Sequence, residues 1–255
     1  LIVACFRKGN EQELREFGAT TRELLELADW LKSGNCEMIA MESTASYWKP
    51  LYNVLEASEL NAIVVNAHHM KAVPGRKTDA KEAEWIADLL QHGLLKASYI
   101  PSKDQRELRE LVRYRKSLVG ERTRELNRLQ KMLEGANIKL SGTVSDINGK
   151  SARSILEYLI TGESIDSEKY DEMYEKKVIA HNLKASKEQI IDDLNGIMTP
   201  LQRRMMKELL THLDELNIHI KNLDDEINDF MKPEEKQAAK DIQDITGIGN
   251  SSAQA

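Results

Sequence analysis

Hydrophobic and polar positions along the first third of the chain switch repeatedly between the periods of strands and helices. Short apolar runs with β-branched residues alternate with stretches in which apolar residues recur every three or four positions. The predicted elements are strands at residues 1–6 and 11–17, a helix at 20–31, a strand at 36–41, a helix at 47–57, a strand at 62–65 and a helix at 79–91. This order predicts an α/β domain in which a hairpin leads into a strand–helix–strand unit.

Beyond Pro101 the pattern becomes helical only. The predicted elements are a long helix at residues 102–134, a polar loop at 141–149 and shorter helices at 151–160 and 186–196. A further helix then starts with Thr199 as its N-cap, Pro200 in the first position and Gln202 in the capping-box position. The second part of the chain is therefore expected to be all-α.

A heptad of apolar residues runs along this last helix and stops at Pro233. Its members follow a 3-4-3-4-3-4-3 spacing: Met206, Leu209, Leu213, Leu216, Ile220, Leu223, Ile227 and Phe230. A 3.5-residue period held over this length predicts a coiled-coil seam. The partner is either a second copy of the chain, which we favour because the seam is narrow and apolar, or residues 108–133 of the same chain in a helical hairpin.

The chain has 255 residues, enough for one large domain or two to three small ones. We expect a ribonuclease-H-like α/β domain at residues 1–97, a helical coiled-coil region at 98–240 and the start of another domain at 241–255. In a ribonuclease-H-like fold one more strand precedes the hairpin, and here it would lie before Leu1. Because Leu1 stands inside an apolar run and Ala255 follows a newly opened motif, we expect a chain cut at both ends.

The charge of the chain is acidic overall but basic in one place. Lys and Arg number 36 against 42 Asp and Glu, a net charge of −6, yet residues 103–131 hold ten basic and five acidic residues. That segment is therefore +5 and the remainder −11, and a local basic segment points to a polyanionic partner. Cys5 and Cys36 are expected to be reduced, buried thiols. Without a signal peptide or a membrane-spanning apolar run, we expect a cytoplasmic protein.

Three carboxylates are candidates for a metal site. Glu42 ends an apolar run and is expected at the rim of the sheet, where ligands of α/β proteins bind. Asp79 and Glu82, three residues apart, lie on one face of a helix start. Each also has an ordinary explanation, Glu42 as a solvated strand end and Asp79 with Glu82 as a capping pair. Together they suggest a Mg²⁺ site for phosphodiester chemistry, although such a site usually needs about four acids.

Two groups of residues are candidates for binding nucleic acid. Arg76, Lys77 and Thr78 stand directly before Asp79. On the long helix, basic residues recur at 3-4-3 spacing and resume after Gly120: Arg106, Arg109, Arg113, Lys116, Arg124, Arg128 and Lys131. We call these seven residues the basic face. Arginine predominates, which favours phosphate contacts, although acidic residues interspersed along the helix are also compatible with an ordinary charged surface.

The end of the chain, residues 242–253, has the apolar-Gly-apolar-Gly pattern of a helix-hairpin-helix turn. Gly247 and Gly249 allow backbone N–H groups to approach a phosphate at the start of the next helix. Ser251 and Ser252 fall in the first turn of that helix. A serine there is either an ordinary N-cap or a hydroxyl nucleophile favoured by the helix dipole.

At these residues the sequence resembles the DEDD-type transposases of the IS110 group, the bridge-RNA-guided recombinases. The resemblance rests on residues 42–48, on residues 77–83 and on residues 246–253, and it covers essentially the whole chain. It implies a Holliday-resolvase-like domain with four acids, a serine that forms a covalent phosphoserine intermediate with DNA, and a bridge RNA that pairs with donor and target DNA. It also implies a dimer of dimers joined by the coiled coil.

Residue by residue, the resemblance places the second acid of the family at Glu42, the third at Asp79 and the fourth at Glu82, where the family normally has Asp. The nucleophile corresponds best to Ser252, with Ser251 as the alternative. The first acid would lie before Leu1, so we expect this chain alone to be catalytically deficient.

These features predict an RNA-guided DNA recombinase that uses Mg²⁺, DNA, a structured RNA and a homodimeric coiled coil. Two alternatives remain open: a metal-dependent junction resolvase that hydrolyses DNA without a serine intermediate, and a non-enzymatic dimeric scaffold that binds nucleic acid.

Overall fold

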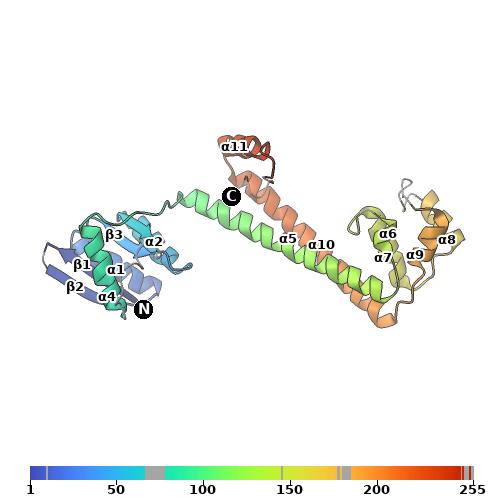
Figure 1. The fold of residues 1–255 in the computed structure, drawn as a ribbon, viewed down its shortest axis with the longest axis horizontal. Helices are drawn as coiled ribbons and strands as arrows, with labels where there is room; N and C mark the ends of the chain where they lie inside the picture. Colours follow the sequence, from blue (N-terminus) through green and yellow to red (C-terminus); the bar gives the residue numbers. More distant parts are fainter. Residues whose placement is uncertain are drawn as a thin grey trace. The chain divides into compact units, whose positions relative to one another are not determined.

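The structure, a computed structural model, describes residues 1–9, 11–66, 78–144, 146–176, 179, 185–247, 249 and 253. It divides into two compact units, Leu1–Pro101 and Ser102–Ala255. The first unit is mixed α/β and the second is helical (Figure 1). No helix in the described ranges is long and apolar enough to cross a membrane.

The first unit contains two separate two-stranded sheets. Its elements are β1 Ile2–Lys8, β2 Glu11–Phe17, α1 Thr21–Ser33, β3 Ile39–Glu42, α2 Trp48–Ala57, β4 Ala62–Val65 and α4 Asp79–Gln91. β1 and β2 form the predicted antiparallel hairpin, and β3 and β4 pair in parallel across the intervening α2. The element order predicted from the hydrophobic pattern is confirmed, although β3 begins three residues later than expected.

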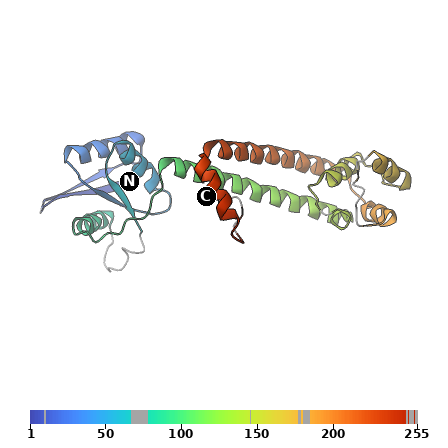
Figure 2. The ribbon, with the colours of Figure 1, turned by 90° about the horizontal axis from the view of Figure 1, so that it is seen from above.

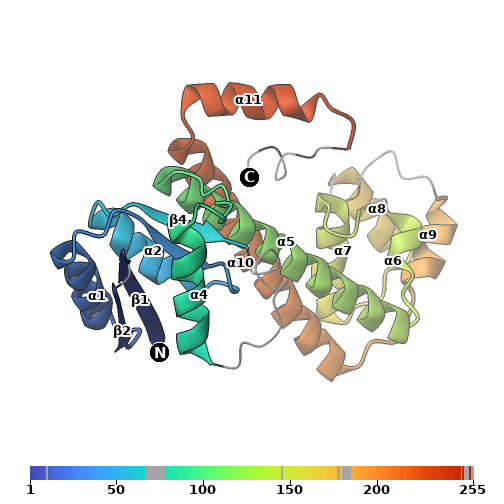
Figure 3. The same cartoon turned by 60° about the vertical axis from the view of Figure 1, so that its left-hand side comes forward.

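Successive residues of β1 face two helical layers, as the twofold period of a strand requires. Phe6 packs edge-on against Trp30 of α1, with ring centroids 5.9 Å apart. Arg7, the next residue, forms an ion pair with Asp88 of α4. Figure 3 shows α1 and α4 on opposite sides of the hairpin. The sequence therefore gives β1 two covered faces, which is typical of a strand inside an α/β sheet.

The second unit is built on a long antiparallel helical hairpin. α5, Lys103–Gly135, and α10, Pro200–Phe230, lie side by side in both views (Figures 1 and 2). Arg115 Nε donates to Asp224 Oδ1 at 2.9 Å, and Arg122 donates to Asn217 at 3.2 Å. Residue numbers fall along α10 as they rise along α5, so the two helices are antiparallel.

The heptad seam packs within the chain, which corrects our preference for a partner in a second copy. Met206, Leu213, Leu216, Ile220 and Ile227 are buried, while Leu209 and Leu223 are half-buried and Phe230 is exposed. Their partners include apolar residues of α5 such as Leu118 and Leu129. A 3.5-residue period specifies a helical partner but not which chain supplies it, and the helix within the same chain fills this seam.

Shorter helices enclose the far end of the hairpin in one apolar core. They are α6 Leu140–Thr143, α7 Lys150–Thr161, α8 Ser167–Glu175 and α9 Lys187–Leu194. The predictions for α7 and α9 are confirmed. The expected polar loop starts instead with the single turn α6, and α8 was not predicted because its apolar side is only Tyr170 and Met173. Pro233 separates α10 from a further helix, α11 Pro233–Gln243.

Candidate functional site

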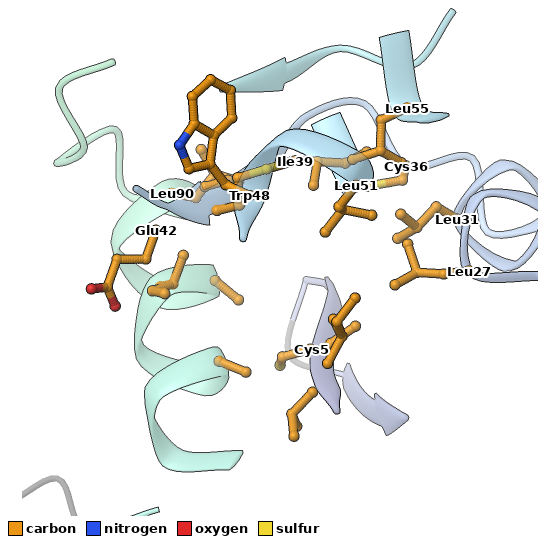
Figure 4. A pocket seen from close by; sticks show the side chains of 18 of the residues that line it. Cys5, Leu27, Leu31, Cys36, Ile39, Glu42, Trp48, Leu51, Leu55 and Leu90 are labelled. Carbon is orange, nitrogen blue, oxygen red and sulfur yellow. The ribbon is translucent and has the colours of Figure 1, made fainter. Parts of the chain in front are cut away.

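Glu42 is the last residue of β3 and stands at the carboxyl end of the parallel strand pair. It pairs in register with Val65 of β4, and the next amide, Ser43 N–H, donates to the Val65 carbonyl at 2.9 Å. The Glu42 side chain is half-buried and lies at the rim of a cavity (Figure 4). The carboxyl edge of a parallel pair is where α/β proteins bind ligands, so the predicted placement of Glu42 is confirmed by the strand geometry.

A hydroxyl group holds the Glu42 carboxylate in place. Thr44 Oγ1 donates to Glu42 Oε1 at 2.7 Å. This hydrogen bond occupies one lone pair and leaves the other carboxylate oxygen available, as a metal ligand requires. The sequence analysis did not single out Thr44, although a threonine two residues after a candidate acid was the signal that could have done so.

Asp79 and Glu82 occupy the first turn of α4, as the sequence predicted. The helix is capped by Thr78, whose Oγ1 accepts from the Lys81 N–H at 3.4 Å. The alternative explanation of Asp79 as a capping residue is therefore wrong, because Thr78 fills that role. The Asp79 side chain is exposed and the Glu82 side chain is half-buried. An exposed carboxylate that caps no helix is available to a cation.

Asp79 and Glu82 thus share one helical turn, but the structure does not gather them with Glu42. Within the described residues, no group of three or more His, Cys, Asp or Glu side chains is positioned to hold a metal ion. Each carboxylate has the oxygen chemistry that Mg²⁺ prefers.

The basic face lies on the side of α5 that is turned away from α10. Arg113, Lys116, Arg124, Arg128 and Lys131 are exposed, whereas Arg106 and Arg109 are half-buried. The buried positions of α5, such as Leu108, Val112 and Leu129, fall on the opposite side of the helix. Packing of the hairpin therefore leaves most of the basic side chains in solvent.

Two arginines of the basic face have acidic neighbours on their own helix. Arg128 forms an ion pair with Glu125, whose side chain is only 7% exposed, and Arg124 Nη2 lies 3.9 Å from Glu121. Arg128 therefore stabilises a buried carboxylate, which gives it a structural role in addition to any binding role.

The structure describes only part of two candidate groups, the residues directly before Asp79 and the turn at the end of the chain. Arg76, Lys77, Ser251 and Ser252 lie outside the described residues. Gly247 has φ +94°, a conformation that favours glycine, and nothing lies within 4 Å of the position its Cβ would take. The glycine predicted to open the turn after α11 therefore adopts the backbone conformation that such a turn requires.

A model of the DEDD transposases of the IS110 group, described as a transposase family, matches residues 2–138. The match covers more than half of the chain and includes both Glu42 and α4. This chain belongs to the IS110 family of DEDD transposases. None of the curated proteins compared with it is similar enough in sequence to match.

Membership in the IS110 family of DEDD transposases implies DNA transposition, and enzymes of this type use a divalent metal ion. The matched region of the transposase runs from β1 through α5 to Ile138, so it contains the basic face as well as the three acids. The sequence analysis identified the family from the residues around Glu42 and Asp79, and the family match confirms that identification.

Proposed function

We propose that this transposase cuts and rejoins DNA with Mg²⁺ bound at the carboxyl edge of its strand pair. The observation that carries the proposal is the position of Glu42, which ends β3 beside β4 and is fixed by the Thr44 hydroxyl. Asp79 and Glu82 supply the further ligands in this proposal, with the first unit folded as a ribonuclease-H-like domain at residues 1–97. Mg²⁺ bound there would stabilise negative charge on the phosphodiester oxygens during strand cleavage.

We further propose that bringing Glu42 and the first turn of α4 together accompanies binding of metal and DNA. Each carboxylate repels the others while the site holds no cation, and a divalent ion removes that repulsion. Exposure of Asp79 fits this role, because a side chain outside the packed core moves at low cost.

The bond-making step in this proposal belongs to a serine, Ser252 or Ser251. Its hydroxyl attacks a DNA phosphorus, the bond to the departing DNA oxygen breaks, and the serine proton leaves to solvent or to a base. Gly247 and Gly249 form the turn before it, in a domain that starts near residue 241.

The basic face of α5 is proposed to bind the phosphate backbone of DNA or of a structured guide RNA. Its side chains spread along a helix of 33 residues, about 50 Å at 1.5 Å per residue, which is long enough to follow a duplex groove or backbone. The contacts are charge-based, so affinity is expected to fall steeply with salt.

The metal role is tested by DNA strand exchange with the full-length transposase and its insertion-sequence ends. Glu42→Gln and Glu82→Gln each remove one charge, and we expect each to slow strand exchange by at least about a hundredfold. Glu16→Gln is the matched control, because Glu16 is exposed on β2 of the same unit. Equal rates for Glu42→Gln and Glu16→Gln would exclude Glu42 from the site.

The second candidate is a junction resolvase that hydrolyses DNA without a covalent intermediate. The same three carboxylates favour it. Ser252→Ala, tested with and without Ser251→Ala, separates the two. The transposase proposal predicts that the double variant loses strand cleavage and any protein–DNA adduct, whereas a resolvase keeps cutting. A non-enzymatic scaffold predicts that replacing Asp79 changes nothing.

A further inference from the structure

The turn that follows β3 is held by backbone hydrogen bonds directly after Glu42. Ser43 N–H donates to the Val65 carbonyl at 2.9 Å, so the pairing with β4 continues one residue beyond the strand. The Thr44 carbonyl accepts from the Tyr47 N–H at 3.2 Å, where α2 is about to start. Thr44 therefore lies between two fixed points of the backbone, one on β4 and one at α2.

Ala45, the next residue in this turn, adopts a backbone conformation that residues with a side chain disfavour. Its φ is +47°, in the left-handed region, where a Cβ atom crowds the following carbonyl oxygen. A residue other than glycine stays in this region only where the surrounding structure determines its conformation, and such residues are concentrated at functional sites. The conformation of the turn beside Glu42 is therefore set by its surroundings.

The turn places the Thr44 hydroxyl on one oxygen of the Glu42 carboxylate. Thr44 Oγ1 donates to Glu42 Oε1 at 2.7 Å, and both residues line the same cavity. Figure 4 shows the Glu42 carboxylate directed away from the apolar side chains Leu31 and Leu51. The Thr44 side chain is exposed to water, and the fixed backbone of the turn reduces the entropy lost in keeping this hydrogen bond.

The two oxygens of the Glu42 carboxylate are therefore not equivalent as metal ligands. A donated hydrogen bond withdraws negative charge from the oxygen that accepts it and restrains rotation of the carboxylate. A cation consequently meets more negative charge at Oε2 than at Oε1. Glu42 is thereby prepared to bind a metal ion through one oxygen and not through both.

The number of oxygens that a carboxylate offers matters because Mg²⁺ and Ca²⁺ use carboxylates differently. Mg²⁺ requires near-octahedral geometry, and the two oxygens of one carboxylate are too close together for neighbouring corners of an octahedron. Ca²⁺ is larger, accepts about six to eight oxygens and takes one or both oxygens of a carboxylate. A carboxylate restricted to one oxygen therefore favours Mg²⁺, whereas an unrestrained carboxylate also serves Ca²⁺.

We propose that Thr44 determines which divalent ion the candidate site accepts. By holding Oε1, its hydroxyl makes Glu42 a ligand with one oxygen and so selects Mg²⁺ against Ca²⁺. Thr44 is a positioning residue, because it acts through Glu42 and does not touch the ion. The inference rests on the proposed metal role of Glu42 and adds the residue that sets the metal preference.

The experiment measures metal preference in the full-length transposase bound to its insertion-sequence ends. Bound Mn²⁺ is followed by electron paramagnetic resonance, and the concentrations of Mg²⁺ and of Ca²⁺ that release half of it are compared. Glu42→Gln defines the Mn²⁺ held at the candidate site, as the fraction lost when Glu42 is replaced. Thr44→Val removes the hydroxyl and keeps the shape of the side chain, whereas Thr44→Ser keeps the hydroxyl. Ser46→Ala, the matched control, removes a different hydroxyl from the same turn.

We expect the ratio of the Ca²⁺ to the Mg²⁺ concentration to fall by about tenfold or more in Thr44→Val, because Ca²⁺ alone gains a ligand oxygen. Thr44→Ser and Ser46→Ala should keep the ratio of the unsubstituted protein. Ca²⁺ should correspondingly inhibit Mg²⁺-dependent strand exchange at a lower concentration in Thr44→Val.

An unchanged ratio in Thr44→Val, with Mn²⁺ still lost in Glu42→Gln, would overturn the role of Thr44 and leave the metal role of Glu42 standing. An equal fall of the ratio in Thr44→Ser would also overturn it, because the shape of the side chain and not its hydroxyl would then be responsible. Mn²⁺ binding that survives in full in Glu42→Gln would overturn the proposed metal site and this inference together.

Discussion

Glu125 is a charged side chain that the helical hairpin buries. It lies on the packed side of α5, where its carboxylate contacts Arg128, and His212 Nδ1 of α10 lies 3.6 Å from Glu125 Oε1. Leaving a buried carboxylate without a partner costs more free energy than the ion pair itself contributes. The main role of the Arg128 guanidinium is therefore to compensate the charge of Glu125.

Replacing Arg128 by alanine is therefore expected to destabilise the protein by about 1–3 kcal/mol, because Glu125 then lacks its closest cation. Lys131→Ala is the control, since Lys131 is an exposed member of the same basic face and should change stability by no more than about 0.5 kcal/mol. Urea denaturation of both variants measures the difference. Equal stabilities would show that His212 or water compensates Glu125 without Arg128.

At the scale of single residues, the sequence predicted the candidate acids but not the side chains that surround them. Glu42 was identified because an acid after an apolar run must end a strand. The Thr44 hydrogen bond and the choice of Thr78 over Asp79 as the cap depend on local backbone angles that residue spacing does not determine. The ion pair of Arg128 was likewise hidden, because a helix pattern shows which residues are neighbours but not which carboxylate becomes buried.

At the scale of secondary-structure elements, the coiled-coil pattern of α10 is explained by its packing against α5 in the helical hairpin. α5 and α10 are joined by apolar packing and by polar pairs such as Arg115 with Asp224. The heptad was predictable because α10 keeps its 3.5-residue period from Met206 to Phe230. Its partner was not, because a seam of leucine and isoleucine packs equally well against a helix of the same chain or of another.

An intramolecular seam predicts a melting temperature that does not depend on protein concentration. We expect the same midpoint from about 1 to 100 µM, because no association is coupled to folding of the hairpin. Leu216→Ala should lower that midpoint at every concentration by creating a cavity in the seam, at a cost of about 2–5 kcal/mol. A midpoint that rises with concentration would instead show that a second copy completes the seam.

For the whole molecule, the distribution of charge matters more than its sum. The chain is acidic at −6, yet the basic face stays in solvent because α10 packs on the other side of α5.

The hydrophobic pattern predicted an α/β first part and a helical second part. It could not predict that β1–β2 and β3–β4 form two separate sheets, because a strand pattern does not show which edge of a strand is paired.

The basic face predicts salt-dependent binding of structured RNA and duplex DNA. Replacing Arg113 and Lys116 together by glutamine should weaken binding and reduce the salt slope by about 0.9 for each lost phosphate contact on duplex DNA. The control replaces Lys207 and Lys221, exposed lysines of α10, and makes the same charge change elsewhere in the hairpin. Equal slopes for the two double variants would show that only net charge matters.

The central claim is that the acids beside the strand pair bind the metal ion used in DNA chemistry. Its most direct test is DNA strand exchange by full-length transposase carrying Asp79→Cys, measured in Mg²⁺ and in Mn²⁺. A thiolate binds Mg²⁺ poorly and accepts the softer Mn²⁺ better, so we predict an activity lost in Mg²⁺ and recovered at least about tenfold in Mn²⁺. Equal activity in the two metals, whether lost or retained, would contradict a ligand role for Asp79.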